Sequence, residues 1–459
     1  MSGSFESLDV PPTLVSFAVT TAKVGDIVSP EFKEAGRKVV LLKPEYNEKG
    51  IPTPESEIAL YAKVRALVDE GKAAAIYTPT FGGVAEAVMK MSFGNSIGFE
   101  FDSDVAYDDI FGYRYGAFVI ELTEDIDIGI KLGVTTEAGV IAYNGKSISI
   151  DELFTTSENK LESVYSCNIK QEKRNIHAFS YRATEYPSPK SKFASPRVLI
   201  PVFPGTNCEY DSAKAVRDAG ATPEIFVIKN LTSRAIAESV EAFARRVEES
   251  QAIFIPGGFS GGDEPDGSGK FITAFFRNGA VKEAVNKLMY TRDGMMLGIC
   301  NGFQALIKLG LVPYGEIVDT KDTDPTLTFN TIGRHQSKIV RTRVASNKSP
   351  WLMNTQVGEI YSVPISHGEG RFIASESQII KLVENGQIAT QYVDLTGTPS
   401  FDVQYNPNDS VFAIEGITSP DGRVLGKMGH SERIGDGLYK NVEGNYQMGL
   451  FDSLCKYYK

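Results

Sequence analysis

The feature that most constrains this chain is the segment 294–310, GMMLGICNGFQALIKLG, in which Gly298 and Gly302 flank Cys300. The apolar run 295–299 predicts a buried strand. The apolar residues that follow have the spacing of one helical face, and a glycine ends the run. Strand, tight turn and helix form the pattern of a nucleophile elbow, with cysteine in place of serine.

The chemistry of such a turn accounts for the residue types around Cys300. Glycines have no Cβ, so the backbone and a substrate can approach each other closely. The partial positive charge at a helix N-terminus favours the thiolate, which is the reactive form of cysteine. The Asn301 N–H would face the oxygen of an attacked carbonyl. A small buried cysteine in a core is the alternative reading, but the two glycines favour a nucleophile.

Composition sets the broad class of protein. With 459 residues the chain is expected to form two or three domains, and 42% hydrophobic and 23% charged residues are typical of a globular protein. A net charge of −11 argues against nucleic-acid binding, and no apolar run is long enough to span a membrane. Four widely spaced cysteines without a C-x-x-C pair disfavour a metal site or disulfides, and they suit the cytoplasm.

The first part of the chain, residues 1–155, has the alternating pattern of one α+β or α/β domain. Residues 12–19 read as a strand, although nothing before them could be its partner. Gly82 and Gly83 open a predicted helix whose N–H groups could hold a phosphate, but a simple tight turn is the commoner reason for such a pair. Further elements are predicted as a strand at 38–42, a helix at 55–68 and a strand at 73–77.

Residues 156–195 are polar and rich in proline and serine, which predicts a helix and a linker between domains. From residue 196 onward, strands and helices alternate at lengths typical of a parallel sheet with helices on both faces. Cys300 would then lie at the carboxyl end of a central strand, where open α/β sheets bind ligands. The predicted strands are 198–203, 224–228 and 252–255, and the predicted helices are 211–219 and 236–247.

The segment 256–263, PGGFSGGD, contains the G-x-S-x-G pattern of serine hydrolases around Ser260. The pattern continues as Gly-Gly-Asp-Glu-Pro, which cannot begin the required helix cleanly. We therefore reject Ser260 as a nucleophile.

A thiol nucleophile needs a base, and the base needs a carboxylate to orient it. Two segments offer His-x-Glu after a predicted strand: His367-Gly-Glu369 and His430-Ser-Glu432. In extended chain, residues two apart point to the same side, so either pair could form the dyad. Spacing alone leaves both alternatives open, and it gives His335 no clear role.

The run 298–304, GICNGFQ, resembles the nucleophile motif of the class I glutamine amidotransferases, which are built on a flavodoxin-like parallel sheet. In that family the cysteine takes the side-chain amide of glutamine and releases ammonia. The resemblance implies that Cys300 is the nucleophile and that L-glutamine is the substrate. It also implies that the glutaminase reaction needs no cofactor or metal.

The same resemblance distinguishes the two histidines. The family's catalytic His-x-Glu lies near the C-terminus, which implies that His430 is the base and Glu432 the orienting carboxylate. The family motif is typically Pro-His-Pro-Glu, whereas Gly429 and Ser431 stand in the proline positions here. The resemblance also implies that N–H groups around 258–259 complete the oxyanion hole. The residues expected to bind glutamine are Gly258, Phe259, Asn301, Gln304, His367 and Glu369.

A second resemblance covers the first part of the chain. The runs PPTLVSFAVTTAKVGDIVSPEFK and FGGVAEAVMKMSFGNSIGFEFD are similar to the C-terminal lobe of the aminoimidazole-ribonucleotide-synthetase-like fold. Together with the glutaminase motif they resemble the formylglycinamidine ribonucleotide synthetases (phosphoribosylformylglycinamidine synthases) of the long single-chain type. The implied organisation is a synthetase-like lobe at 1–155, with residues 1–20 left over from a missing lobe, a helix and linker at 156–195, and a class I amidotransferase domain at 196–459.

The family resemblance implies a glutamine-dependent ligase of purine biosynthesis. Its partner would be the missing N-terminal synthetase region, and ATP and Mg²⁺ would serve the full-length synthetase at sites largely absent from this chain. Two alternatives remain: another Cys–His hydrolase on the same fold, or an inert fragment that needs its missing half.

Overall fold

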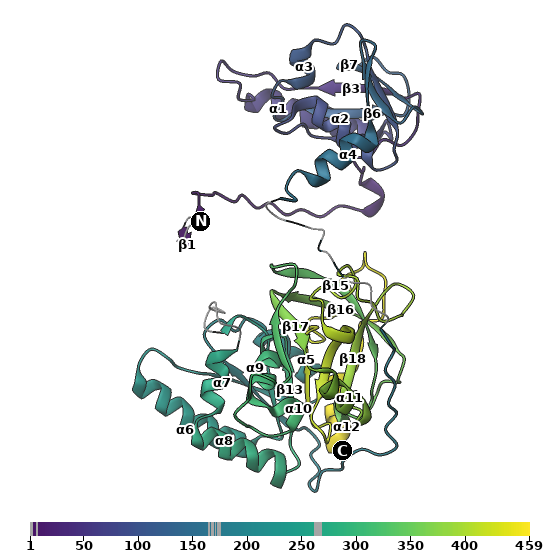
Figure 1. The fold of residues 1–459 in the computed structure, drawn as a ribbon. Helices are drawn as coiled ribbons and strands as arrows, with labels where there is room; N and C mark the ends of the chain where they lie inside the picture. Colours follow the sequence, from purple (N-terminus) through teal and green to yellow (C-terminus); the bar gives the residue numbers. More distant parts are fainter. Residues whose placement is uncertain are drawn as a thin grey trace. The chain divides into compact units, whose positions relative to one another are not determined.

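The computed structural model describes the chain except for residues 1–2, 6–7, 164–165, 167–168, 170, 172–175 and 261–268. The chain divides into two compact units, Met1–Ser166 and Cys167–Lys459 (Figure 1), and each is described by itself. Among the described residues, every helix is too short or too polar to cross a membrane.

The first unit is built on a seven-stranded sheet in the order β4-β6-β3-β7-β5-β8-β9, in which only β5 and β8 are parallel neighbours. Its strands are β1 (Gly3–Phe5), β2 (Leu8–Val10), β3 (Lys38–Leu42), β4 (Ala73–Tyr77), β5 (Gly98–Phe101), β6 (Phe118–Leu122), β7 (Ile130–Thr136), β8 (Val140–Tyr143) and β9 (Lys146–Ser149). Its helices are α1 (Pro54–Asp69), α2 (Gly83–Phe93), α3 (Tyr107–Phe111) and α4 (Ile150–Asn159), with a helical turn η1 (Val24–Asp26).

Strand β3 shows how this sheet is covered. Val39 and Leu41 belong to one hydrophobic cluster, which includes residues of α2, whereas Val40 and Leu42 belong to another, which includes residues of α1. Alternate residues of a strand point to opposite faces, so the two helices cover opposite faces of the sheet. The predicted strand and helix positions in 38–83 agree with the structure.

The strand predicted at 12–19 is wrong. Residues 11–23 adopt neither helix nor strand, and Leu14 and Phe17 are 97% and 90% exposed. A strand is stabilised by hydrogen bonds to a neighbouring strand, and this segment joins none of the sheets of the described residues. Its β-forming composition is therefore not enough to make a strand.

The second unit contains a nine-stranded sheet and most of the remaining helices. Its strands are β10 (Arg197–Val202), β11 (Thr222–Val227), β12 (Ala252–Ile255), β13 (Met295–Ile299), β14 (Thr326–Phe329), β15 (Gln336–Val344), β16 (Ile360–His367), β17 (Glu369–Ile373), β18 (Ile388–Val393), β19 (Ile414–Thr418) and β20 (Val424–Lys427). Its helices are α5 (Glu209–Asp218), α6 (Ser233–Glu249), α7 (Lys270–Phe276), α8 (Gly279–Asn286), α9 (Asn301–Leu309), α10 (Leu311–Tyr314), α11 (Glu376–Glu384) and α12 (Leu450–Tyr458). Short helical turns are η3 (Lys287–Thr291), η4 (Pro350–Leu352) and η5 (Val411–Ala413).

The large sheet contains the predicted parallel sheet as one half and extends it with antiparallel strands. Its order is β11-β10-β12-β13-β20-β19-β18-β15-β16. The pairs from β11 to β20 are parallel, but those from β20 to β16 are antiparallel. Strands β14 and β17 form a separate antiparallel pair. Figure 1 shows α6 and α8 together on one side of this unit, with β15, β16 and β18 on the other.

Strand β13 lies in the parallel half between β12 and β20, and all five of its residues are buried. Its side chains join the main hydrophobic cluster of the unit, to which α9 contributes Phe303, Leu306 and Ile307. The apolar face predicted for residues 303–307 is therefore the face that packs α9 into the core. The carboxyl end of β13 is the point from which the site is built.

The segment 176–195 is more firmly attached than a linker would be. The Tyr181 N–H donates to the Ala345 carbonyl at 2.9 Å, and the Phe193 N–H donates to the Tyr458 carbonyl at 2.9 Å. The side chain of Phe193 packs edge-on against Tyr458, with 5.9 Å between the ring centroids. Although its composition is that of a linker, this segment is part of the second unit.

Candidate active site

Cys300 occupies the turn between β13 and α9 in a strained conformation. Its φ is 53° and its ψ is −106°, a region that residues with a side chain rarely adopt. The turn is held at both ends, because the Cys300 N–H donates to the Lys427 carbonyl at 2.9 Å and the Gln304 N–H donates to the Cys300 carbonyl at 3.0 Å. The thiol is thereby fixed at the carboxyl end of the parallel strands.

The two glycines beside Cys300 are needed for close packing. A Cβ added at Gly302 would lie 2.0 Å from the Ile255 carbonyl oxygen at the end of β12. A Cβ added at Gly298 would lie 2.6 Å from the Gly302 carbonyl oxygen and 2.5 Å from Leu306 Cδ1. No side chain fits at either position, so the glycines let the first turn of α9 lie directly on the sheet.

His430 and Glu432 form a buried dyad beside the cysteine. His430 Nδ1–H donates to Glu432 Oε1 at 2.6 Å, and the two residues are 2% and 3% exposed. The His430 N–H donates to the Pro364 carbonyl at 2.9 Å, which fixes the backbone of the dyad against β16. The other ring nitrogen, Nε2, is buried and has no hydrogen-bond partner among the described residues, so it can exchange a proton with a nearby group.

The charge state of His430 is set by its neighbours. Burial lowers the pKa of His430, but the Glu432 carboxylate and interactions with the thiols of Cys208 and Cys300 raise it by more, to well above the ordinary histidine value. An imidazolium next to a cysteine stabilises the thiolate electrostatically. The structure thus brings Cys300, His430 and Glu432 together in the order that nucleophilic catalysis requires.

Cys208 is a neighbour of the dyad that sequence reasoning missed. It follows β10 and precedes α5, and its Sγ lies 3.9 Å from His430 Nδ1 and 3.1 Å from Asn207 Oδ1. Its position after a predicted strand could have indicated this, because the carboxyl ends of parallel strands meet at one edge of a sheet, where Cys300 also lies. Cys208, His430 and Glu432 offer potential metal ligands within 4.8 Å of one another, but Nδ1 carries the proton shared with Glu432, and we assign no metal there.

The loop after β12 reaches the dyad at Gly257. A Cβ at Gly257 would lie 2.6 Å from His430 Cε1 and 3.5 Å from Cys300 Cβ. In the same loop the Phe259 N–H donates to the Gly205 carbonyl at 2.8 Å. The Phe259 N–H is thus bonded within the protein, whereas the Gly258 N–H takes no part in that bond. The oxyanion role of the N–H groups around 258–259 stays a prediction.

Ser260 lies in the same loop but not at a helix that follows a strand. Its N–H donates to Asn301 Oδ1 at 3.3 Å, which ties the loop to the start of α9. Gly262 of the G-x-S-x-G pattern lies outside the described residues. The arrangement gives Ser260 a role in connecting the loop to α9.

Gln304 holds two elements together, and its contact with glutamine stays a prediction. Its Oε1 accepts a hydrogen bond from Asn301 Nδ2 at 2.9 Å, and its Nε2 donates to the Glu369 carbonyl. Both polar ends of this buried side chain are therefore engaged within the protein. The amide ties α9 to β17, while the Asn301 N–H stays in the first turn of α9, where N–H groups have no intrahelical partner.

His367 lies near the dyad but differs from His430 in its chemistry. It is 2% exposed, and neither ring nitrogen has a hydrogen-bond partner among the described residues. Burial, together with the charges of His430 and His335, lowers the pKa of His367 to about 3. The Glu369 carboxylate lies 3.4 Å from Lys308 Nζ. The structure therefore does not pair His367 with Glu369 as it pairs His430 with Glu432.

His335, for which the sequence suggested no role, is connected to the site through Ser366. His335 Nε2 and Ser366 Oγ are 3.0 Å apart, and the Ser366 carbonyl oxygen lies 3.7 Å from Cys300 Sγ. The end of β16 therefore lies against the Cys300 thiol and lines the site.

Comparison with known proteins gives a family match within the second unit and relatives that cover about half of the chain. Residues 195–458 match the family described as the CobB/CobQ-like glutamine amidotransferase domain. The chain is 34% identical over 262 residues to the phosphoribosylformylglycinamidine synthase subunit PurQ of Methanococcus maripaludis strain C7, which covers 55% of this chain and 86% of that protein. It is 35% identical over 263 residues to the same subunit of strain C5, covering 55% and 87%.

Among solved structures, PurLQS from Thermotoga maritima has 25% sequence identity and a TM-score of 0.42, over 58% of this chain and 100% of that one.

Proposed function

Through residues 195–458 the chain belongs to the CobB/CobQ-like glutamine amidotransferase family, and we propose that it uses Cys300 to release ammonia from L-glutamine. The observation that carries this proposal is the buried arrangement of Cys300, His430 and Glu432 at the carboxyl end of β13. The relatives in Methanococcus maripaludis support a glutaminase of purine biosynthesis, in phosphoribosylformylglycinamidine synthase.

The reaction begins with attack of the Cys300 thiolate on the side-chain carboxamide carbon of glutamine. The oxyanion that forms accepts hydrogen bonds from the Asn301 N–H and the Gly258 N–H. His430, which holds the thiol proton, delivers it to the departing ammonia, and Glu432 keeps the ring in the required tautomer. The products of this step are free ammonia and a γ-glutamyl thioester on Cys300.

Water completes the cycle. With its proton given to ammonia, His430 acts as the base that removes a proton from the attacking water, and the same N–H groups hold the second oxyanion. Collapse of this intermediate breaks the carbon–sulfur bond, releases glutamate and restores the Cys300 thiolate beside the imidazolium. Hydrolysis of the thioester, with His430 as the base, is therefore sufficient to complete turnover.

In the complete enzyme the ammonia would be used in a synthetase step. We propose that it converts formylglycinamide ribonucleotide, activated by ATP with Mg²⁺, into the amidine. That step belongs to a synthetase region that acts as the partner of this glutaminase, and the first unit is proposed to be one lobe of it. The cysteines among the described residues, Cys208, Cys300 and Cys455, are free thiols, in keeping with our proposal of a cytoplasmic location.

A diazo-ketone analogue of glutamine provides the first test. Such an analogue binds as glutamine does and alkylates the nucleophile, so peptide mass spectrometry identifies the modified residue. We expect labelling at Cys300 that excess glutamine blocks, and no labelling of the Cys300→Ala variant. Labelling at Cys208 or Cys455 would overturn the assignment of the nucleophile. Labelling at Cys300 that glutamine does not block would favour another Cys–His hydrolase.

A further inference from the structure

A charged pair lies buried directly behind the catalytic dyad. Lys427 is the last residue of β20, and Glu415 is in the adjacent strand β19. Lys427 Nζ lies 3.2 Å from Glu415 Oε1, and the side chains are 1% and 0% exposed. Burying two charges is costly unless each makes close and complete polar contacts, so a pair in this position calls for an explanation.

Lys427 Nζ has three polar neighbours, two that accept hydrogen bonds and one that forms an ion pair. An ammonium group has three N–H donors, and Nζ contacts the Gly429 carbonyl at 2.9 Å, Ser431 Oγ at 3.2 Å and Glu415 Oε1 at 3.2 Å. Glu415 Oε1 also accepts the Gly429 N–H at 2.6 Å, and Thr390 Oγ1 donates to Glu415 Oε2. The group formed by Lys427 and Glu415, which we call the 415/427 clamp, therefore has polar contacts at Nζ and at both carboxylate oxygens.

The contacts of the 415/427 clamp fall on the residues that flank His430. Gly429 is held by both its N–H and its carbonyl, and Ser431 is held by its hydroxyl, so the backbone is fixed on each side of the histidine. We propose that Lys427 and Glu415 are positioning residues that hold His430 and Glu432 at the geometry needed for proton transfer to and from Cys300. This inference rests on the glutaminase function proposed above.

The residue types around His430 fit this role. The Gly429 N–H is the donor to Glu415, and a proline at this position would have no N–H to give. A Cβ at Gly429 would lie 2.7 Å from both methyl groups of Val363, so no other residue fits without displacing β16. The segment 429–431 has no proline to restrict its backbone. The clamp supplies the rigidity that the local sequence does not.

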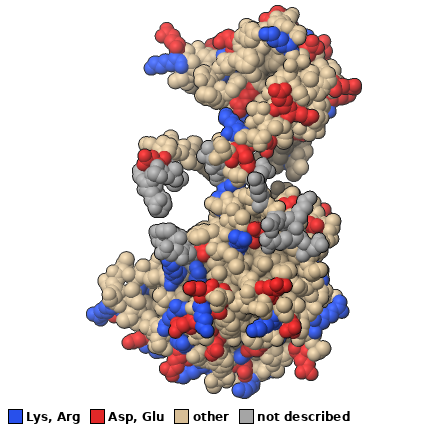
Figure 2. Space-filling model, viewed as in Figure 1, with Lys and Arg blue, Asp and Glu red and all other residues tan. Residues whose placement is uncertain are grey.

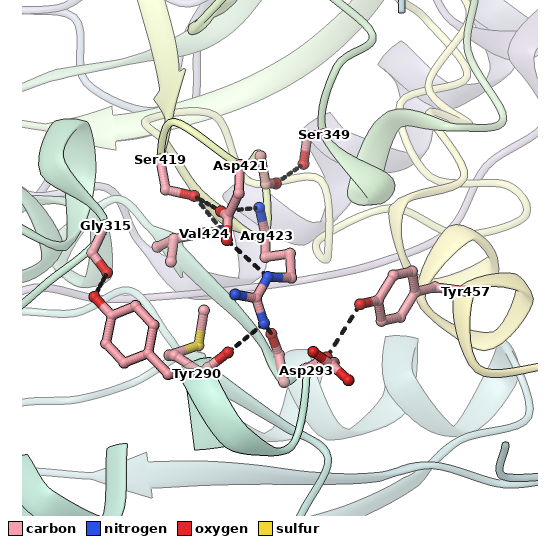
Figure 3. Close-up of polar contacts among 12 residues, drawn as sticks. Tyr290, Asp293, Gly315, Ser349, Ser419, Asp421, Arg423, Val424 and Tyr457 are labelled. Atoms are coloured by element: carbon pink, nitrogen blue, oxygen red, sulfur yellow. Dashed lines mark hydrogen bonds and ion pairs between the residues drawn. The ribbon is translucent and has the colours of Figure 1, made fainter. Parts of the chain in front are cut away.

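A second cation, at the other end of β20, provides a matched control. Arg423 directly precedes β20 and pairs with Asp421 at 2.7 Å (Figure 3). It also contacts the carbonyls of Met289 and Gly294. Lys427 is four positions along the chain from Arg423, which in an extended strand is about 13 Å. Arg423 therefore stabilises the opposite end of β20, and its contacts do not include the dyad.

The experiment compares Lys427→Met/Glu415→Gln with Arg423→Met. The double substitution removes both charges together, because Lys427→Met alone would leave the Glu415 carboxylate buried without its cation. For each folded variant, kcat and KM for glutamine are measured, together with the low-field NMR signal of the His430 Nδ1 proton. The chain has only four histidines, which simplifies the assignment of this signal.

We expect the double variant to lose about 10- to 100-fold in kcat, as small displacements of catalytic groups do, with KM changed by less than about twofold. The His430 signal should broaden or disappear. Arg423→Met should melt at a lower temperature but keep kcat and the His430 signal. A double variant with wild-type kcat would overturn the proposal, as would an equal loss of kcat in Arg423→Met.

Ser431→Ala keeps the proposal testable if the double variant does not fold. It removes one contact of Lys427 and leaves both charges in place, and we expect kcat to fall about threefold; an unchanged kcat would count against the clamp. Failure of the proposed function is a separate result. If wild-type Cys300 is not labelled by the glutamine analogue, the His430 signal in the double variant still decides whether the clamp positions the dyad.

Discussion

His430 and His367 are equally buried but have opposite titration behaviour, and the difference lies in their partners. His430 shares a proton with Glu432, so the imidazolium form is stabilised and the pKa is raised well above the usual value in spite of burial. His367 has no hydrogen-bond partner for either ring nitrogen among the described residues, and burial lowers its pKa to about 3. At neutral pH one histidine is charged and the other is neutral.

This difference predicts different kinetic roles. His430→Ala should reduce glutamine turnover by about 10²- to 10⁴-fold, because the proton donor and acceptor for Cys300 is lost. His367→Ala should leave a measurable rate, since a neutral ring without a carboxylate partner does not carry the proton. Steady-state assays of ammonia release from the two variants test this ranking, and the reverse order would contradict our assignment of the base.

His367 also predicts a pH effect on stability. Its pKa is depressed in the folded state, so between pH 6.5 and about 3 the unfolded chain binds a proton that the folded chain does not. His367 therefore does not lower the free energy of unfolding above pH 6.5, and it lowers this free energy progressively as the pH falls. From pH 6.5 to pH 5 this amounts to about 2 kcal/mol.

The neutral variant His367→Gln should lack this part of the acid destabilisation. Denaturant titrations of wild type and variant at pH 6.5 and pH 5 give the comparison, and the difference in free energy of unfolding between the two proteins should shift in favour of the variant at pH 5. Parallel changes in both proteins would show that His367 titrates normally.

For single residues, the sequence predicted a role only where the residues that define it are close together in the chain. The elbow around Cys300 was predicted because its glycines and its strand–helix pattern lie within a few residues. The contacts of the Phe259 N–H with Gly205 and of Gln304 with the Glu369 carbonyl were not predicted, because these partners are distant in the chain. Cys208 was missed for the same reason. The choice between the two histidines came from family resemblance, since both have the same spacing to a glutamate.

At the scale of elements, the elbow depends on how closely α9 lies against β12. Gly302→Ala would place a Cβ 2.0 Å from the Ile255 carbonyl oxygen, and neither backbone can move without disturbing the sheet. We expect a loss of about 3 kcal/mol in free energy of unfolding, together with slower labelling of Cys300. Denaturant unfolding and the labelling rate measure the two effects.

Gly279→Ala is the matched control for that substitution. Gly279 is the first residue of α8, and a Cβ there would meet no atom within 4 Å. Its stability should change by no more than about 0.5 kcal/mol. Equal behaviour of the two variants would mean that contact with β12 does not explain the glycine at 302.

The elements themselves were largely predictable, but their pairing was not. The alternation of strands and helices from residue 197 to 255 agrees with β10 to β12, since periodicity is a local property. The antiparallel half of the sheet was missed because the local sequence pattern does not reveal which strands pair. In the structure β20 is followed in the sheet by β19, β18, β15 and β16. The segment 12–19 has a strand-like composition but joins none of the sheets of the described residues, and composition alone could not show this.

At the scale of the whole molecule, the two units have separate hydrophobic cores. Every member of the largest cluster lies between Phe179 and Tyr458, whereas the clusters of the first unit lie between Phe32 and Tyr143. A unit that buries its own core can fold alone. Figure 2 shows acidic and basic side chains intermixed over the visible face of the second unit.

The position of the boundary gives the last prediction. Composition placed a linker up to residue 195, but Gln171 bonds to the Phe401 carbonyl at 2.8 Å and accepts from the Val403 N–H at 3.0 Å. Phe179 and Phe193 pack against the core of the second unit. A fragment of residues 167–459 should therefore fold cooperatively, whereas a fragment of residues 196–459 loses two packed aromatic side chains and several hydrogen bonds.

We expect the shorter fragment to be less stable by at least about 3 kcal/mol, which corresponds to a melting temperature lower by about 6–12 °C. Calorimetry of the two fragments, with Cys300 labelling as a check that the site has formed, measures the difference. Equal melting temperatures would mean that residues 176–195 are a true linker and that their contacts contribute nothing to stability. A lower melting temperature for the shorter fragment would show that the amidotransferase unit begins before residue 195, at a boundary that long-range contacts define and composition does not.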